Sequence, residues 1–307
     1  MTNPEGDRLR IGLIGTGFWA DQCHAAAIDE HGDLDFVGIW GRDPDKALEL
    51  AGRHGTVPFS SADELFAATD AIVFAVPPAV QAELAPRAAA AGCHLLLEKP
   101  IATSSSDAWR IAQACADNGV QSAVNFSLLW GGATGPWLDE VVAPVDWDGG
   151  SVTILGDLRV TESPFSASPW RRLDNGSLWD VGPHAFSLLV AALGPVTDLH
   201  AEHGRGDGFV ITLRHRDGGI STATLSYSLG AGSGEFRVEF WGAEGLVTPP
   251  AVDADADVSP AASAAPALDA LLAAIRSGRA TKYDAEFGAQ IVDLLARADS
   301  TASSTAH

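Results

Sequence analysis

The stretch "RIGLIGTGFWA", residues 10–20, decides the fold. An apolar run leads directly into Gly15, Gly17 and Ala20, in the spacing G-x-G-x-x-A, and a helical pattern continues to about Glu30. A strand, a glycine turn and a helix in this order are typical of the first unit of a dinucleotide-binding fold. Gly15 permits the tight turn, Gly17 lets a pyrophosphate approach the backbone, and the helix N-terminus supplies amide donors. A purely structural glycine turn is the alternative.

The first third of the chain continues to alternate apolar runs with helical segments. We expect strands at 35–40, 71–76, 94–98 and 120–126, and helices at 43–53, 61–68, 79–92 and 106–119. Asp43 and Ser61 are suited to cap two of these helices, and Gly119 is suited to end the last. Nearly all-apolar strands that alternate with helices predict a parallel sheet covered on both faces.

The later part of the chain has a different pattern. Strands separated by turn residues are expected at 151–160, 209–216, 220–228 and 235–242. In the last of these, Phe236, Val238 and Phe240 alternate with charged residues, which predicts one face packed on helices and one open face. The open face is either wetted by solvent or an interface for a homo-oligomer.

The end of the chain contains two further helices. Residues 249–266 are predicted to be a loop, 267–278 and 286–300 helices, and the final "TASSTAH" frayed. The pattern as a whole predicts an α/β protein. We expect residues 1–124 to form a Rossmann domain with a doubly wound parallel sheet. Residues 125–307 are expected to form a substrate-binding α/β domain with an open, mainly antiparallel sheet, whose terminal helices can pack back on the first domain.

Composition excludes several classes of function. The 307 residues include 40 acidic and 19 basic ones, for a net charge of -21, and no basic run is present. Such a chain repels nucleic acids and anionic membranes, so we expect neither as a partner. The three cysteines show no CxxC or zinc spacing, the N-terminus is polar, and no apolar run is long enough to span a membrane. Reduced thiols and a cytoplasmic location are expected.

The end of the second strand, "IWGRD" (residues 39–43), bears on the choice of cofactor. NAD-binding folds usually place an acid here to hold the ribose 2′-hydroxyl. Trp40 and Gly41 occupy these positions instead, and Arg42 follows, which can pair with a 2′-phosphate. This favours NADP over NAD. In the alternative interpretation, Arg42 is only a solvated side chain and Asp43 only a helix cap.

The stretch "LLLEKPIATS", residues 95–104, brings Lys99 to the end of a buried strand. Ligands of parallel sheets bind beyond the carboxyl ends of the strands, so Lys99 is placed to polarise a substrate oxygen or to move a proton. In the alternative interpretation, Lys99 pairs with Glu98 or another acid and only closes the strand.

A second pair of polar residues lies in "DNGSLWDVGPH", residues 174–184. Asp180 and His184 are four apart and would share one face of a helix, where the carboxylate could orient a histidine base. Pro183 either breaks that helix or belongs to the first turn of a later one. The alternatives are a core histidine and a capping aspartate, and a metal site is a minor possibility because no further ligand is recognisable. Nearby tryptophans form either a sugar-stacking wall or part of the core: Trp130, Trp137, Trp170 and Trp179.

Together these motifs resemble those of the Gfo/Idh/MocA family, named after glucose-fructose oxidoreductase, inositol dehydrogenase and rhizopine catabolism. The matching segments are, in order, "IGTGFWA", "GRDPDKA", "FAVPPAVQAELA", "GCHLLLEKPIA", "WRRLDNGSLWDVGPH" and "VEFWGAEGLV". The resemblance implies a Rossmann domain and an open-sheet domain. It also implies hydride transfer between NAD(P) and a secondary alcohol or ketone of a sugar, cyclitol or related polyol.

The resemblance also implies the site residues. The catalytic ones would be Lys99, Asp180 and His184. The cofactor contacts would be Gly15, Thr16, Gly17, Phe18, Trp19, Gly41, Arg42, Ala75, Pro77, Glu98, Lys99, Asn125, Trp170 and Arg171. The complete catalytic set argues against an NAD(P)-binding sensor or scaffold, whereas a lyase or glycosidase that uses the nicotinamide transiently stays open.

The chain departs from the family pattern at three places. Gln81 stands where the P-P-x-x-H motif has histidine, only Gly176 is left of a G-G-G run, and "NFSLLW" lacks an arginine. Since these departures lie mostly on the substrate side, they leave the substrate undetermined.

Overall fold

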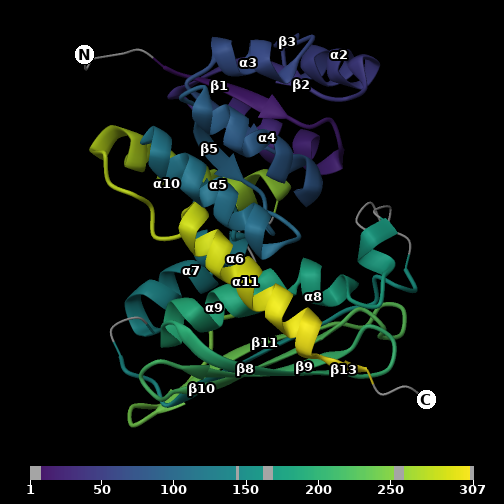
Figure 1. The fold of residues 1–307 in the computed structure, drawn as a ribbon, viewed down its shortest axis with the longest axis vertical. Coiled ribbons are helices and arrows are strands. Elements are labelled where there is room, and N and C mark those ends of the chain that lie inside the picture. Colours follow the sequence, from purple (N-terminus) through teal and green to yellow (C-terminus); the bar gives the residue numbers. More distant parts are fainter. Residues whose placement is uncertain (1–7, 143–144, 162–168, 252–258, 305–307) are drawn as a thin grey trace. The chain divides into compact units, whose positions relative to one another are not determined.

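The computed structural model describes residues 8–142, 145–161, 169–251 and 259–304 (Figure 1). The chain divides into two compact units. The first contains residues 1–127 and 257–289, and the second contains residues 128–256 and 290–307. The division between 289 and 290 falls within the last helix, α11 (Ala285–Thr301).

The first unit contains a six-stranded parallel sheet. Its strands are β1 (Leu9–Ile14), β2 (Leu34–Trp40), β3 (Val57–Pro58), β4 (Ala71–Phe74), β5 (His94–Leu97) and β6 (Ser122–Val124). They are arranged in the order β3-β2-β1-β4-β5-β6. The chain reverses its direction of winding between β1 and β4, the point at which such sheets bind ligands. The predicted doubly wound parallel sheet is confirmed.

Helices of the first unit begin and end where local signals place them. They are η1 (Ala20–Ala25), α1 (Ala26–Glu30), α2 (Pro44–Arg53), α3 (Ala62–Ala68), α4 (Pro78–Ala90), α5 (Ser105–Asn118) and α10 (Pro260–Ser277). The Asp43 carboxylate accepts from two backbone N–H groups of α2, and Ser61 Oγ accepts from one of α3. Gly119 ends α5 at φ 64°, a left-handed conformation that suits glycine. These three predictions are confirmed.

The second unit contains a seven-stranded mixed sheet. Its strands are β7 (Gly149–Leu155), β8 (Val196–His203), β9 (Phe209–His215), β10 (Ile220–Ser226), β11 (Glu235–Gly242), β12 (Gly245–Val247) and β13 (Ser303–Ser304). The order is β12-β11-β7-β10-β9-β8-β13. The central pair β7–β10 and the edge pair β8–β13 are parallel, and the other pairs are antiparallel.

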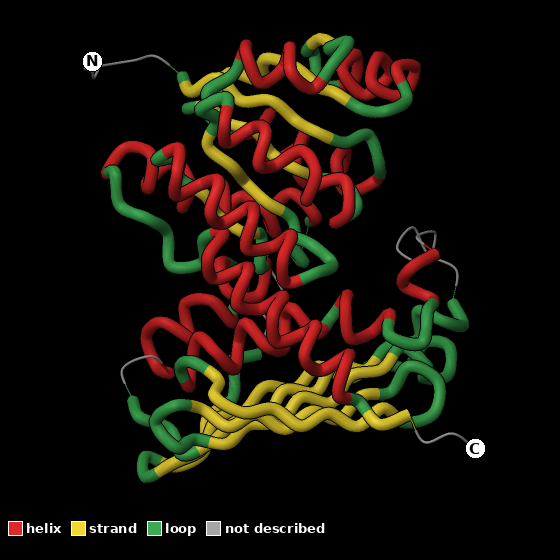
Figure 2. Tube along the Cα trace, viewed as in Figure 1, coloured by secondary structure: helices red, strands yellow, loops and turns green. Residues whose placement is uncertain are grey.

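Helices lie along one side of this sheet in the described part of the unit (Figure 2). Its helical segments are α6 (Ser127–Trp130), α7 (Thr134–Trp137), η2 (Leu138–Val142), η3 (Pro169–Arg172), α8 (Gly176–Asp180), α9 (Gly182–Leu193) and the later part of α11. Strand β9 alternates strictly between buried and exposed residues, as a sheet with one covered face requires. The predicted open face is confirmed.

Several predictions about the elements were wrong or incomplete. Helix α10 begins at Pro260, seven residues before the expected start at 267, because Ser259 Oγ caps it and Pro260 is tolerated in a first turn. Strand β8 was not predicted, and Ser303–Ser304 pair with it where fraying was expected. The remainder of the predicted loop and tail, 252–258 and 305–307, lies outside the described residues. No described helix is long and apolar enough to cross a membrane.

Candidate active site

The glycine turn leads from β1 into η1 and lies against the residues that end β2 and follow β4. Gly15 donates its N–H to the Trp40 carbonyl (2.9 Å) and has φ 136°. A Cβ at Gly15 would lie 2.3 Å from the Ala75 carbonyl oxygen, so only glycine fits. A Cβ at Gly17 would meet nothing within 4 Å. The backbone at Gly17 therefore faces open space, as the close approach of a pyrophosphate requires.

The end of β2 has no acidic side chain directed to a ribose. Gly41 is packed against Thr16, since a Cβ at Gly41 would lie 2.5 Å from Thr16 Cγ2. Arg42 is exposed. Asp43 Oδ1 accepts from the N–H groups of Asp45 (3.1 Å) and Lys46 (3.3 Å), so this carboxylate caps α2. The alternative interpretation of Asp43 as a helix cap is therefore confirmed.

Glu98 is the common partner in a network of polar contacts near the ends of β5 and β6. Its Oε1 accepts from Trp19 Nε1 (2.8 Å) and Asn125 Nδ2 (2.8 Å) and lies 2.7 Å from His24 Nε2. Burial alone would raise the pKa of this carboxyl, but the His24 contact, the Asn125 hydrogen bond and the Lys99 charge outweigh it and lower the pKa. Glu98 thus stays charged and ties the helix after the glycine turn to the segment that carries Lys99.

Gln81 holds the backbone on both sides of Lys99. Its side chain is fully buried. Nε2 donates to the carbonyls of Glu98 (2.8 Å) and Ile101 (3.0 Å), and Oε1 accepts from the Glu98 N–H (2.9 Å). A primary amide offers two donors and an acceptor, whereas a neutral histidine offers only one of each. Glutamine, at the position where the P-P-x-x-H motif has histidine, therefore makes a set of three hydrogen bonds to this turn that a histidine could not make.

Asn125 carries a buried acceptor that the described residues leave unused. The residue is 2% exposed, and its Oδ1 has no hydrogen-bond partner among them. A buried polar atom without a partner is costly, so a bound donor at this place would stabilise it. The other residues predicted for the cofactor also follow the carboxyl ends of parallel strands: Thr16, Phe18 and Trp19 after β1, Ala75 and Pro77 after β4, and Lys99 after β5.

In the second unit, Asp180 and His184 lie on two helices and not on one. Helix α8 ends at Asp180, and α9 begins at Gly182 with Pro183 in its first turn. Of the two alternatives for Pro183, the structure has the second, in which the proline belongs to the first turn of a later helix. His184 is half-buried in the first turn of α9.

Asp180 accepts two hydrogen bonds from side chains outside its own helix. The residue is 6% exposed, and its Oδ2 accepts from Arg171 Nε (2.8 Å) and from the Tyr227 hydroxyl (2.6 Å). Arg171 reaches it because Gly176 lets the backbones touch: a Cβ at Gly176 would lie 2.2 Å from the Arg171 carbonyl oxygen. Arg171 was predicted to contact the cofactor, and in the structure it holds Asp180.

Two of the four tryptophans belong to the core. Trp137 is 7% exposed and lies with its ring 5.8 Å from that of Phe240. Trp179 is 8% exposed, and its Nε1 donates to Asp299. Trp130 and Trp170 are half-buried, and the Arg171 guanidinium lies 4.8 Å from the Trp170 ring centre. Within the described ranges, no group of three or more His, Cys, Asp or Glu residues could hold a metal ion.

Sequence reasoning did not find three residues of these networks. The partner of His24 is 74 residues away along the chain, and that of Tyr227 is 47 residues away. No local pattern signals such contacts. Gln81 was noticed only as a departure from a motif, and its role depends on backbone atoms 17 and 20 residues away.

Comparisons with known proteins agree on one family. The model of the oxidoreductase family with an NAD-binding Rossmann fold (GFO/IDH/MocA) matches residues 9–126, and the model of the GFO/IDH/MocA C-terminal domain matches residues 153–248. The solved structure of GenD2 from gentamicin A biosynthesis, in complex with NAD, covers all of this chain and 98% of its own, with a TM-score of 0.82 and 22% identity. At that identity the likeness shows the fold alone.

Curated relatives are similar over parts of their length. An uncharacterized oxidoreductase of Synechocystis is 28% identical over 63% of this chain and 53% of its own, so the chain spans about half of that relative. The dTDP-3,4-didehydro-2,6-dideoxy-α-D-glucose 3-reductase of Saccharopolyspora spinosa is 26% identical over 79% of this chain and 76% of its own. The NADP⁺-dependent scyllo-inositol 2-dehydrogenase IolU of Bacillus subtilis is 30% identical over 67% and 69%.

Proposed function

The chain belongs to the Gfo/Idh/MocA oxidoreductase family, and on this premise we propose that it transfers hydride between NAD(P) and a secondary alcohol or ketone of a sugar, cyclitol or related polyol. One observation carries the proposal. Glu98 Oε1 joins Trp19, which follows the glycine turn, to Asn125 and to the segment bearing Lys99. The residues suited to hold a dinucleotide and the lysine suited to the chemistry thus belong to one partly buried network.

The first unit fits a dinucleotide at the two places where its geometry can be tested. The open space at Gly17 leaves room for the pyrophosphate, and the buried Oδ1 of Asn125 can accept a hydrogen bond from a bound donor. We assign the remaining cofactor contacts to Gly15, Thr16, Phe18, Trp19, Gly41, Arg42, Ala75, Pro77, Glu98, Lys99, Trp170 and Arg171.

NADP is the preferred cofactor in this proposal. Position 41 carries no acid that would repel a 2′-phosphate, Arg42 supplies an exposed cation, and Asp43 is engaged as a helix cap. The relative IolU is an NADP⁺-dependent enzyme, which supports the same choice.

We assign residues 1–124 to the cofactor domain and 125–307 to the substrate domain. The cofactor supplies the hydride acceptor or donor. In the oxidative direction, His184 takes the hydroxyl proton, and the Lys99 ammonium stabilises the negative charge that develops on the substrate oxygen. Asp180 orients His184 and favours the protonated imidazole.

The open face of the seven-stranded sheet is the proposed site of a homo-oligomer. Its central strands present mainly uncharged side chains, including Val210, Thr212, Thr222 and Thr224. A small-molecule substrate and a location in the cytoplasm complete the proposal, and the acidic charge argues against nucleic acid as a partner.

The test is turnover of a panel of sugars, cyclitols and nucleotide-linked sugars, followed by nicotinamide absorbance with each dinucleotide. Lys99→Met should lower kcat on any active substrate by about two powers of ten or more and weaken dinucleotide binding much less. The matched control is Lys282→Met, which removes an exposed lysine from the same unit. Wild-type kcat in Lys99→Met would remove Lys99 from the mechanism. A chain that binds dinucleotide but turns over no member of the panel would fit a scaffold better.

A further inference from the structure

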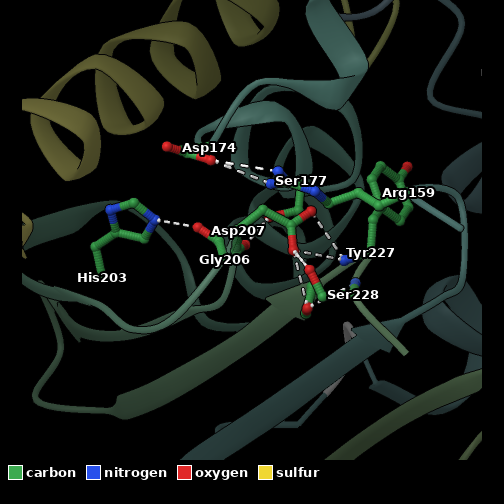
Figure 3. Close-up of polar contacts among 9 residues, drawn as sticks. Arg159, Asp174, Ser177, His203, Gly206, Asp207, Tyr227 and Ser228 are labelled. Atoms are coloured by element: carbon green, nitrogen blue, oxygen red, sulfur yellow. Dashed lines mark hydrogen bonds and ion pairs between the residues drawn. The ribbon is translucent and has the colours of Figure 1, made fainter. Parts of the chain in front are cut away.

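A buried polar cluster in the second unit lies next to Asp180, and neither the sequence motifs nor the family resemblance includes it. Its centre is Asp207, a fully buried residue in the loop between β8 and β9 (Figure 3). Its Oδ1 accepts from Ser226 Oγ (3.0 Å), Ser228 Oγ (2.7 Å) and the Tyr227 N–H (3.1 Å). Its Oδ2 accepts from the same N–H at 3.0 Å. One carboxylate therefore fixes three successive residues at the end of β10.

The same loop is attached to the helix that carries Asp180. The Asp207 carbonyl oxygen accepts from Ser177 Oγ at 2.5 Å, and Ser177 belongs to α8, whose last residue is Asp180. The other end of the cluster also reaches α8, because the Tyr227 hydroxyl donates to Asp180 Oδ2 at 2.6 Å. Helix α8, the Asp207 loop and the end of β10 thus form a closed ring of hydrogen bonds.

We propose that Tyr227 is a positioning residue for Asp180 and that the Asp207 carboxylate fixes Tyr227 for this task. The role of Asp180 in the reaction rests on the function proposed above, whereas the ring itself does not. A short hydrogen bond from a hydroxyl to a carboxylate is stronger than one between neutral groups. With Arg171 Nε on the same oxygen, it fixes the direction of a carboxylate whose task is to orient His184.

The surroundings keep Tyr227 in the donating form. Burial, and after it the charge of Asp180, raises the pKa of Tyr227 above its ordinary value, so the phenol stays protonated across the working range of pH. The charged and titratable groups around Asp180 in the described chain include Arg171 from η3 and Tyr227, which directly follows β10, and His184 comes four residues later in the first turn of α9. Arg171 and Tyr227 both favour the ionised form of the carboxyl.

Tyr227→Phe tests the proposal, because it removes the hydroxyl and keeps the ring. Without this donor the Asp180 carboxyl should titrate about one pH unit higher, a change that carbon-detected NMR of labelled aspartate can follow in the protein without dinucleotide. In the plot of kcat against pH, the limb on the acid side should move to higher pH by the same amount. At the acid edge kcat should fall about tenfold, with the KM for dinucleotide unchanged. Tyr283→Phe is the matched control, since these are the two tyrosines of the chain.

Asp207 is tested through an exposed neighbour, so that folding is preserved. Ser228→Ala removes one donor to Asp207 and should move the Asp180 titration in the same direction by a smaller amount. A lower melting temperature of Tyr227→Phe, with the Asp180 titration and the pH profile unchanged, would overturn the proposal. If the wild-type protein binds no dinucleotide, the proposed function is wrong. The NMR titration would still decide whether Tyr227 controls the titration of Asp180.

Discussion

Arg42 is the residue on which the choice between NADPH and NADH depends. Its neighbour Gly41 carries no acid that would repel a 2′-phosphate, and the nearest acid, Asp43, is held by two backbone N–H groups of α2. A guanidinium can bind such a phosphate through two parallel hydrogen bonds. The exposed position of Arg42 fits a residue that meets its ligand at the rim of the site.

Arg42→Ala should therefore weaken NADPH binding about tenfold or more and change NADH binding little. Lys46→Ala is the control, because it removes an equal charge four residues further along the chain, in the first turn of α2. Titration calorimetry measures both affinities. Equal losses for the two dinucleotides would show that Arg42 does not contact the 2′-phosphate.

At the scale of elements, Gln81 joins α4 to the segment that follows β5. Three hydrogen bonds from one amide fix the backbone around Lys99. Gln81→Leu should lower the free energy of unfolding by about 2 kcal/mol and kcat by about tenfold, because Leu leaves buried backbone groups without partners. Gln81→His should have a free energy of unfolding and a kcat between those of the wild type and Gln81→Leu, because an imidazole cannot supply two donors and an acceptor. Equal melting temperatures and kcat values for all three proteins would contradict this account of the turn.

His54 links the end of α2 to the first helical segments of the chain. Its Nε2 lies 2.9 Å from Asp21 Oδ1, and its Nδ1 lies 2.5 Å from Asp29 Oδ2. Burial alone would lower the pKa of His54, but the hydrogen bonds to Asp21 and Asp29 outweigh it and raise the pKa. Burial alone would raise the pKa of Asp21, but the hydrogen bond to His54 and the Arg53 charge lower it.

The stabilisation by His54 should therefore depend on pH. A raised histidine pKa contributes stability that is complete below the unfolded value and is lost as pH rises through the folded value. The lowered pKa of Asp21 sets the other limit, since its contribution is lost as pH falls through that value. His54→Asn should cost about 1 kcal/mol near pH 6 and less near pH 9, measured by chemical denaturation. A cost that is constant with pH would exclude the charged bridge.

At the scale of the whole molecule, the seven-stranded sheet has one face that no helix of the described residues of its unit covers. Thr224 lies near the middle of that face on β10, so Thr224→Arg should convert an oligomer to monomers if the face is the interface. Sedimentation velocity measures the mass, and Arg237→Glu on β11 is a control for altered charge nearer the sheet edge. A wild-type protein that is a monomer at high concentration would remove the proposed interface.

Much of this fold was predictable because its signals are local. Asp43, Ser61 and Gly119 mark helix ends through contacts within a few residues, and the apolar strands of the first sheet are continuous runs. Strand β8 was missed because polar residues interrupt its apolar pattern. The segment is extended because it pairs with β9. Gln81, His24 and Tyr227 depend on partners far along the chain, which no local pattern encodes.

The central claim, that the glycine turn holds a dinucleotide, is tested most directly by calorimetric titration of NADPH and NADH into three proteins. These are the wild type, Gly17→Val and Gly52→Val. Both glycines face open space at ordinary φ, so both variants should fold, but only the valine at 17 occupies the room for the pyrophosphate. We predict that the wild type and Gly52→Val bind NADPH more tightly than NADH, and that Gly17→Val loses about a hundredfold in affinity for both. Equal binding by all three proteins, or none by the wild type, would contradict the account.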